Sequence, residues 1–236
     1  MTSVVANGHV ARSGLMVFWA SISAAHWLEY QQWHNCEHIP ERIAIPGFRV
    51  GRRYRNAARP ERFMMFYETD GSHVLASPAY LKALQNPTPW TRRALGWFQD
   101  PARSVYVLEG GSGKALAGEA PLLLVLRHDS DGKWPPSADL GPGRVRHYSL
   151  DPSASNVQTS ERAIHGAVPT VRRRLTLIEC ARLDLLRPFG ANAPTTTACD
   201  LAALAGVPDG IDAEAELYWF ETALRSSDVP EKERQE

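Results

Sequence analysis

The sequence of 236 residues is poor in cysteine, in unbalanced charge and in long apolar runs. Its three cysteines, Cys36, Cys180 and Cys199, are far apart and lack Cys-x-x-Cys spacing, which argues against a disulfide framework or a structural zinc site. Lys plus Arg total 26 and Asp plus Glu total 26, so no excess of positive charge attracts nucleic acid or anionic lipid. The most apolar stretch, residues 121–126, is too short to span a bilayer, and no N-terminal secretion signal is present. We therefore expect a soluble cytoplasmic protein with reduced thiols that acts on a small molecule, without nucleic-acid or membrane partners.

The first half of the sequence predicts the order strand, helix, strand, strand, helix, strand. A short apolar run at 14–21 between turn-forming residues indicates a strand, and the spacing of apolar residues from Ala24 onward indicates a helix that ends at Pro46-Gly47. The remaining predicted elements of this half are strands at 48–56, 62–69 and 102–109 and a helix at 77–85, followed by a tryptophan-containing tail at 87–98.

The second half repeats this order in weaker form after a stretch rich in glycine, serine and alanine at 110–118, which is typical of a flexible connection. Its predicted strands and helix are 121–128, 144–150, 175–183 and 214–223 for the strands and 197–205 for the helix. A helix between the first two strands is missing, and a polar segment is added at 153–167. We predict an N-terminal unit at 10–110, a degenerate C-terminal copy at 119–225 and a disordered tail at 226–236.

The predicted fold class is α+β, with two ferredoxin-like βαββαβ repeats packed as a barrel within one chain. Each repeat makes a four-stranded antiparallel sheet with both helices on one face, and the two bare faces are buried against each other. We expect a small-molecule site in the concave interior, where strand residues line it, because such sites favour concave places.

Chemically reactive side chains concentrate between Trp33 and Tyr54. His34 and His38 are four residues apart and therefore share a helix face. An imidazole with a pKa of about 6.5 can accept or donate a proton at physiological pH, so both are candidate catalytic residues. Glu37 is the third candidate, because it can orient an imidazole or act as a base. The alternatives are hydrogen-bonded structural histidines at a helix end and a solvated helix glutamate.

The segment His34-Asn35-Cys36-Glu37-His38 also fits the His-x-x-Glu-His pattern of inverted zinc peptidases. Pro40 interrupts the helix, however, and no downstream segment supplies a convincing third ligand. We therefore predict no metal and no cofactor, and we keep metal-dependent chemistry through the two histidines as an alternative.

Arginine and aromatic residues near this helix complete the predicted site. Arg49 and Arg53 share one face of the following strand and Arg52 lies on the other, so at most one set faces a cavity. A cavity-facing arginine would hold a carboxylate or an enolate-like oxygen, whereas the alternative is a solubilising sheet edge. Aromatic residues can lend a phenol or an apolar wall, or serve only in packing. The predicted substrate-binding residues are Arg49, Arg52, Arg53, Tyr54, Tyr67 and Trp90.

The βαββαβ order of residues 14–109, the segment from Trp33 to Pro40 and the following Pro46-Gly47-Phe48 together resemble the dimeric α+β barrel superfamily. Within it the sequence is similar to the EthD-like and muconolactone-isomerase-like groups, which carry a histidine late in the first helix, here His38. The resemblance implies a pocket in each unit for small, often ring-bearing molecules. Members include cofactor-free isomerases, cyclases, monooxygenases and decarboxylating enzymes, as well as proteins that only bind.

This chain departs from the single-unit members of that superfamily because it carries two units, the second without an obvious counterpart of His38. Two-unit members that bind haem, such as the chlorite dismutases and dye-decolourising peroxidases, hold the iron through a histidine of the C-terminal unit. Here His128, His147 and His165 are available for that role, without a specific haem signature.

From these observations we expect a cofactor-independent lyase or isomerase that acts on a small aromatic, lactone or related carbonyl compound in a catabolic or specialised pathway. His38 is the predicted general acid or base, and His34 or Glu37 orients it. An arginine and a tyrosine such as Tyr54 would stabilise negative charge on oxygen. The alternatives are a protein that binds a hydrophobic ligand without chemistry and a metal-dependent lyase or hydrolase. Exposed sheet edges and helices make a homodimer reasonable.

Overall fold

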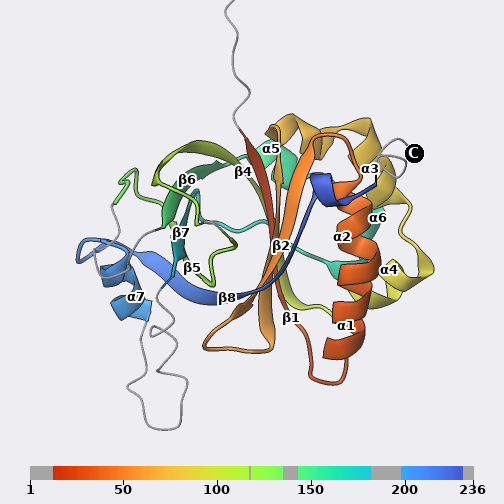
Figure 1. Ribbon diagram of the computed structural model, residues 1–236, viewed down its shortest axis with the longest axis horizontal. Helices are drawn as coiled ribbons and strands as arrows, with labels where there is room; N and C mark the ends of the chain where they lie inside the picture. The colour runs from red at the N-terminus through yellow and green to blue at the C-terminus, as the bar shows by residue number, and fades with distance from the viewer. Residues whose placement is uncertain (1–12, 117, 135–142, 182–197, 231–236) are drawn as a thin grey trace, which may run out of the picture.

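The computed structural model describes residues 13–116, 118–134, 143–181 and 198–230 (Figure 1). Eight antiparallel strands close into one barrel in the order β1-β3-β2-β8-β5-β7-β6-β4. The strands are β1 (Gly14–Ser21), β2 (Phe48–Asn56), β3 (Arg62–Thr69), β4 (Gln99–Gly113), β5 (Leu122–His128), β6 (Arg144–Leu150), β7 (Arg174–Cys180) and β8 (Ala213–Arg225). The predicted bounds of β1, β2, β3 and β6 are confirmed. The signal for β1 was a short apolar run between turn-forming residues.

The barrel has two halves with the same relative strand order, β4-β1-β3-β2 and β8-β5-β7-β6. Pairing of β2 with β8 and of β4 with β6 joins them into one closed sheet. The chain is therefore a mixed α/β protein built on an eight-stranded antiparallel barrel, and the two predicted units share that barrel.

The first four residues of the glycine-rich stretch that we expected to be a flexible connection belong to β4. Its residues 110–113 pair with residues 144–147 of β6. A Cβ on Gly111 would collide with the carbonyl oxygen of Val145, so glycine is required for the close approach of the two backbones. These glycines permit the pairing of β4 with β6 that closes the barrel, and they do not form a flexible linker.

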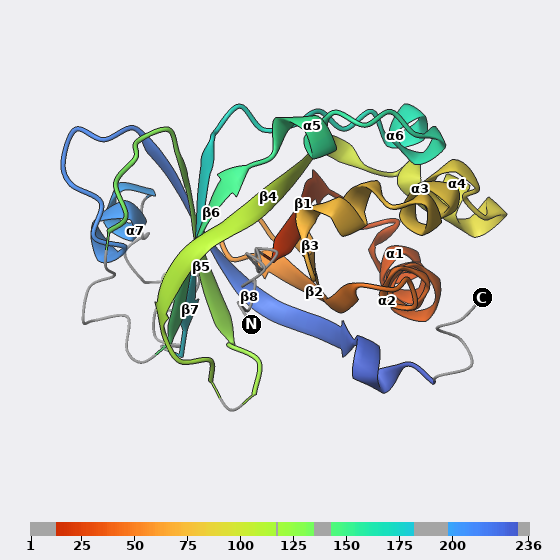
Figure 2. The same cartoon turned by 90° about the horizontal axis from the view of Figure 1, so that it is seen from above.

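Most of the helices gather on the outer face of the N-terminal half, whereas α7 lies at the opposite side of the barrel (Figures 1 and 2). The helical segments are α1 (Trp27–Trp33), the π-helical turn η1 (His34–His38), α2 (Ile39–Ile43), η2 (Ser72–Ala76), α3 (Pro78–Gln85), α4 (Pro89–Leu95), α5 (Pro152–Ser155), α6 (Ser160–His165), α7 (Ala198–Leu204) and η5 (Ser226–Asp228). Within the described ranges no helix combines the length and the apolar character that a membrane crossing needs.

Helices α4, α5 and α6 lie in two stretches of the sequence for which we predicted no helix. The tryptophan-containing tail contains α4, which begins where the Thr88 side chain accepts a hydrogen bond from the Thr91 N–H. The added polar segment between β6 and β7 forms α5 and α6, and α6 packs beside α3 and α4 (Figure 2). A segment of the C-terminal half thus covers the N-terminal half.

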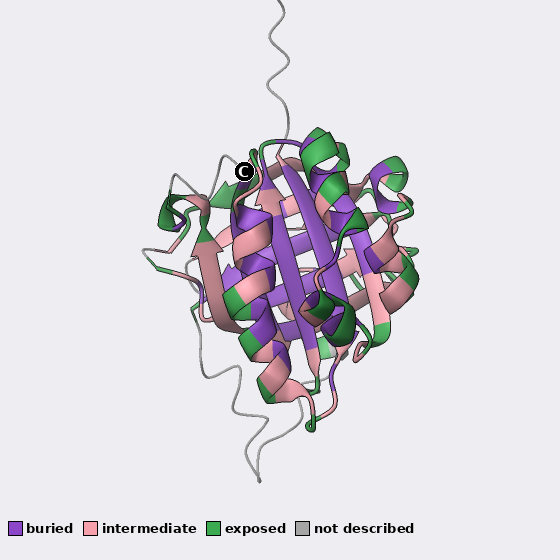
Figure 3. Ribbon diagram, turned by 90° about the vertical axis from the view of Figure 1, so that its right-hand side faces the viewer, coloured by how far each residue is buried: buried purple, intermediate pink, exposed green. Residues whose placement is uncertain are grey.

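Alternate residues of the strands face two different cores. On β1, Met16 and Phe18 face the helices, whereas Val17 and Trp19 point into the barrel. Large side chains fill that interior, among them Trp19, Tyr54, Phe66, Tyr106 and Tyr218. Our expectation of a site in the barrel interior is therefore wrong for this chain, because packing of these side chains occupies the space. Figure 3 shows the buried strands beneath the covering helices.

The segment after β8 also differs from its prediction as a disordered tail. Residues 226–228 form η5, and Val229 is buried against the helix-side core. Residues 231–236 lie outside the described residues, as do the last residues of the strand predicted at 175–183.

Candidate functional site

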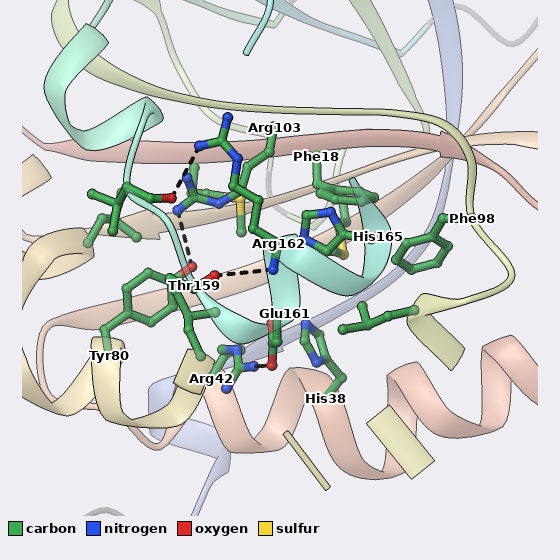
Figure 4. A pocket seen from close by; sticks show the side chains of 16 residues that line it. Phe18, His38, Arg42, Tyr80, Phe98, Arg103, Thr159, Glu161, Arg162 and His165 are labelled. Atoms are coloured by element: carbon green, nitrogen blue, oxygen red, sulfur yellow. Dashed lines mark hydrogen bonds and ion pairs between the residues drawn. The ribbon is translucent and has the colours of Figure 1, made fainter. Parts of the chain in front are cut away.

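A cavity of about 30 Å³ lies between the outer face of the N-terminal strands and the helices that cover it. Its apolar wall comes from Met16, Phe18, Met65, Leu75, Leu84, Leu95 and Phe98, and its ionisable side chains are His38, Arg42, Arg103, Glu161, Arg162 and His165 (Figure 4). Because about 10–15 Å³ suffices for one water molecule, this space holds very few. A ring-sized ligand therefore requires the lining side chains to move apart.

The π-helical turn η1 presents the first of these side chains. The Ile39 N–H donates to the carbonyl oxygen of His34, five residues earlier, which is the hydrogen bond of a π turn. Such turns are rare and are frequent at functional sites. His34 and His38 share a face as predicted, with ring centres 5.8 Å apart and planes at 25°.

His38 is buried and lines the cavity. Its Nδ1 has no hydrogen-bond partner among the described residues, and its ring centre lies 4.5 Å from that of Trp33. Burial holds the pKa of His38 well below 6.5, and the nearby Arg42, His34 and His165 lower it further. His38 is therefore a neutral imidazole at pH 7, the form that can accept a proton.

His34 is fixed by its neighbours. Arg53 donates to His34 Nδ1 at 2.9 Å, so the ring proton is on Nε2, which lies 2.9 Å from the sulfur of Met65. Glu221 in turn accepts from Arg53 at 2.7 Å. Burial, with the charge of Arg53, keeps the pKa of His34 well below 6.5. His34 supports the wall behind His38 through packing and ties η1 to β2.

Glu37 faces α4 instead of either imidazole. Its carboxylate accepts from the hydroxyls of Thr88 at 2.6 Å and Thr91 at 2.9 Å. The zinc-peptidase pattern is therefore not assembled as a metal site. In the part of the chain that the structure describes, no group of three or more His, Cys, Asp or Glu residues is arranged to hold a metal ion.

The three strand arginines that we proposed as substrate ligands lie elsewhere. Arg49 is 58% exposed and pairs with Asp70 at 2.5 Å, Arg52 pairs with Glu68 at 2.7 Å on the interior side of the barrel, and Arg53 holds His34. The predicted opposition of Arg52 and Arg53 is confirmed, because they lie on opposite faces of β2. A register shift between Phe48 and Val50 places Arg49 at an irregular point of the strand.

The predicted aromatic residues are also dispersed. Tyr54 packs inside the barrel, and Trp90 is half-buried against the helix-side core. Tyr67 is nearer to the site, with its ring centre 6.5 Å from that of His38, and its buried hydroxyl has no hydrogen-bond partner within the described ranges. Of the catalytic and substrate-binding residues proposed from sequence, His38 alone lines the cavity and Tyr67 adjoins it.

A buried ion pair that the sequence did not reveal crosses the cavity wall. Arg42 of α2 donates to Glu161 of α6, a residue 119 positions away, and also lies 3.3 Å from Glu41. Burial raises the pKa of Glu161, and Arg42 opposes that rise. The pair connects the N-terminal helix to the added segment of the C-terminal half (Figure 4).

His165, also of α6, places a second imidazole at the cavity. Its Nδ1 accepts from the Ala167 N–H at 2.9 Å, so Nε2 carries the ring proton of the neutral form. Its ring meets that of Phe18 edge-on at 5.2 Å. Burial, followed by the charges of Arg103 and Arg162, lowers the pKa of His165 to about 4. Sequence analysis considered His165 only as a haem ligand, and for Glu161 the available signal was the polar character of 153–167.

The depressed histidine pKa values predict how stability depends on pH. Unfolding returns each pKa to about 6.5, so below that pH the unfolded chain binds protons that the folded chain does not. We expect the free energy of unfolding to be highest above pH 6.5 and to fall as the pH drops toward 4, as measured by urea titrations at several pH values. His165→Gln should flatten this slope between pH 6.5 and 5, whereas substitution of the exposed His73 should not. A slope that is the same in both variants would contradict the assignment.

The other two histidines considered for haem lie beside a smaller hollow of about 10 Å³ in the C-terminal half. His147 Nδ1 is 3.0 Å from the Thr176 hydroxyl, and the His128 ring packs on Trp134 with centres 4.6 Å apart. The space beside them is that of one water molecule, so these residues as arranged do not fit a haem.

The sequence matches no protein-family model and no curated protein. Solved structures do share its fold. An anthrone oxidase-like protein aligns over 94% of this chain and 97% of its own, with 8% identity and a TM-score of 0.53. A candidate monooxygenase of Fusobacterium nucleatum aligns over 91% of this chain and 95% of its own, with 6% identity and a TM-score of 0.50. At these identities the likeness concerns the fold alone, and on that ground the chain has the α+β barrel fold of these proteins.

Proposed function

We propose that the helix-side cavity is the active site of a cofactor-independent lyase or isomerase that acts by acid–base chemistry on a small aromatic, lactone or related carbonyl compound. The observation that carries the proposal is the neutral, buried His38 in the wall of a cavity that also contains cationic guanidinium groups. Removal of a proton from the carbon next to a carbonyl group is assisted by a base that accepts the proton and by positive charge that stabilises the resulting enolate oxygen.

In the proposed reaction, His38 accepts a proton from a carbon atom adjacent to the carbonyl group. The electron pair of that C–H bond moves to the carbonyl oxygen, which becomes an enolate. Arg103 and the Nε2–H of His165 stabilise the negative charge, and the apolar surroundings strengthen that interaction. Return of the proton at another carbon completes an isomerisation, whereas departure of a leaving group completes an elimination.

The surroundings of the cavity support a ring-bearing substrate. Phe18 and Phe98 lie in its wall with ring centres 5.1 Å apart, and aliphatic side chains complete the surface. The repeated strand order supports our interpretation of the chain as two ferredoxin-like copies. That these copies are of the EthD-like or muconolactone-isomerase-like type stays part of our proposal. The same cavity also suits an enolate that reacts further with molecular oxygen.

That second candidate function is oxidation, in which the enolate reacts with molecular oxygen. The observation that favours it is the shared fold with a protein described as anthrone oxidase-like. The two functions begin with the same proton transfer and differ in whether oxygen is consumed.

The test is incorporation of deuterium from D₂O into a panel of lactones and phenolic ketones, followed by proton NMR, with an oxygen electrode in parallel. Deuterium uptake at the carbon next to the carbonyl supports the proposal, and simultaneous oxygen consumption favours the second function. Tight binding of panel members with neither deuterium uptake nor product would instead support a protein that only binds its ligand.

A further inference from the structure

Arg103 of β4 is a buried cation that forms no ion pair with any carboxylate of the described residues. It is 8% exposed and lines the cavity. Its two hydrogen bonds go to neutral acceptors, the carbonyl oxygen of Ala154 and the hydroxyl of Tyr80, each at 3.4 Å. Among the residues that the structure describes, no carboxylate forms an ion pair with it. Most of the five N–H donors of a guanidinium therefore remain for a ligand.

Every other buried arginine in the described ranges has a carboxylate partner. The pairs are Arg42 with Glu161, Arg52 with Glu68 and Glu119, Arg53 with Glu221, and Arg146 with Glu68 and Glu179. Burial of a charge is costly unless an opposite charge and hydrogen bonds compensate it. Arg103 departs from this rule at the cavity wall, where a bound molecule can supply the missing charge.

Arg162 brings a second cation to the same place from α6. It donates to the carbonyl oxygens of Ser155 at 3.0 Å and Val157 at 3.1 Å, and it too has no ion pair with a described carboxylate. Burial and the charge of Arg103 lower the pKa of Arg162, so the two guanidinium groups repel each other across the cavity. An anion bound by both groups would add two attractions that offset that repulsion.

The charges that line the cavity do not balance. Three arginines face it, and its one lining carboxylate, Glu161, is bound by Arg42. We propose that the ligand carries a carboxylate group, bound by Arg103 and Arg162, on an apolar body that packs against Phe18 and Phe98. A carboxylate suits this place because its two oxygens match the paired donors of a guanidinium. This inference rests on the proposed function of the cavity and names the class of its substrate.

The test compares benzoate with the neutral benzamide by isothermal titration calorimetry at pH 7.5 and constant ionic strength. Wild-type protein is expected to bind benzoate at least tenfold more tightly than benzamide. Arg103→Gln should remove that preference, and Arg103→Lys should retain part of it because the charge remains without the paired donors. Arg92→Gln, a change at an exposed arginine of α4, is the matched control and should bind as wild type does.

Equal affinity for the two probes, or no detectable binding of either, would overturn the proposal, as would wild-type benzoate affinity in Arg103→Gln. If Arg103→Gln does not fold, as judged by circular dichroism, Arg162→Gln gives the same comparison at the second cation. The proton-transfer proposal has a separate readout. Deuterium exchange without a preference for benzoate would contradict only the proposal that the ligand carries a carboxylate. A preference for benzoate without exchange in any probe would contradict only the proposed proton transfer.

Discussion

Replacement of His38 by glutamine is expected to lower the rate of deuterium exchange into a true substrate by about a hundredfold or more. Glutamine keeps a polar side chain of similar reach but cannot accept a proton, and loss of a positioned general base usually costs about 10²–10⁴ in rate. The measurement is the initial rate of exchange for the best probe of the panel, at equal concentrations of folded protein.

His73→Gln is the matched control for that change, because His73 is exposed in η2 and does not line the cavity. It should leave the rate unchanged. His34→Gln tests the other imidazole, whose bond to Arg53 gives it a supporting role. We expect it to lower stability more than the rate per folded molecule. A His38→Gln rate within about threefold of wild type would show that His38 is not the base.

Arg42→Met is expected to destabilise the fold by about 3–5 kcal/mol, which is the usual cost of removing one partner of a buried ion pair. The change leaves the carboxylate of Glu161 buried without its cation. The free energy of unfolding from urea titration at pH 7.5 measures this loss. The size of the effect follows from the unpaired charge that remains rather than from the lost bond.

The double variant with Arg42→Met and Glu161→Leu separates those two causes. Replacing both members of a buried pair by apolar residues of similar size is often nearly neutral, so the double variant should recover much of the lost stability. Arg49→Met is the control, because its pair with Asp70 is exposed and such pairs contribute about 0–1 kcal/mol. A double variant less stable than Arg42→Met would contradict the burial argument.

The strands of this fold were predictable because their signals are local. Short extended runs between turn-forming segments gave the bounds of β1, β2 and β3. Local sequence signals did not predict the strand where its structure depends on pairing with a distant strand. Gly110–Gly113 have the composition of a linker, and their place in β4 follows from the close approach of β6, which no local pattern records.

The site was predictable only in part, for a similar reason. The spacing of His34 and His38 showed a shared helix face, and His38 does line the cavity. Arg103, Glu161 and His165 reach it from β4 and α6, and sequence spacing carries no information on such distant contacts. Arg52 was a plausible ligand by residue type alone, yet the alternation of β2 turns it toward Glu68 inside the barrel.

The position of α6 makes the two halves of the chain interdependent. Glu161, Arg162 and His165 belong to the segment between β6 and β7, but they complete a cavity whose remaining wall comes largely from the strands and helices of the N-terminal half. A fragment that ends after β4 would lose a carboxylate, a guanidinium group and an imidazole from its cavity and would leave both edges of its sheet unpaired. Insertions or deletions between β6 and β7 would shift these groups relative to His38. The length of that connection is therefore constrained by the need to place them at a cavity of the N-terminal half. The second half is therefore indispensable to the reaction that we propose, although the proposed base, His38, belongs to the first half.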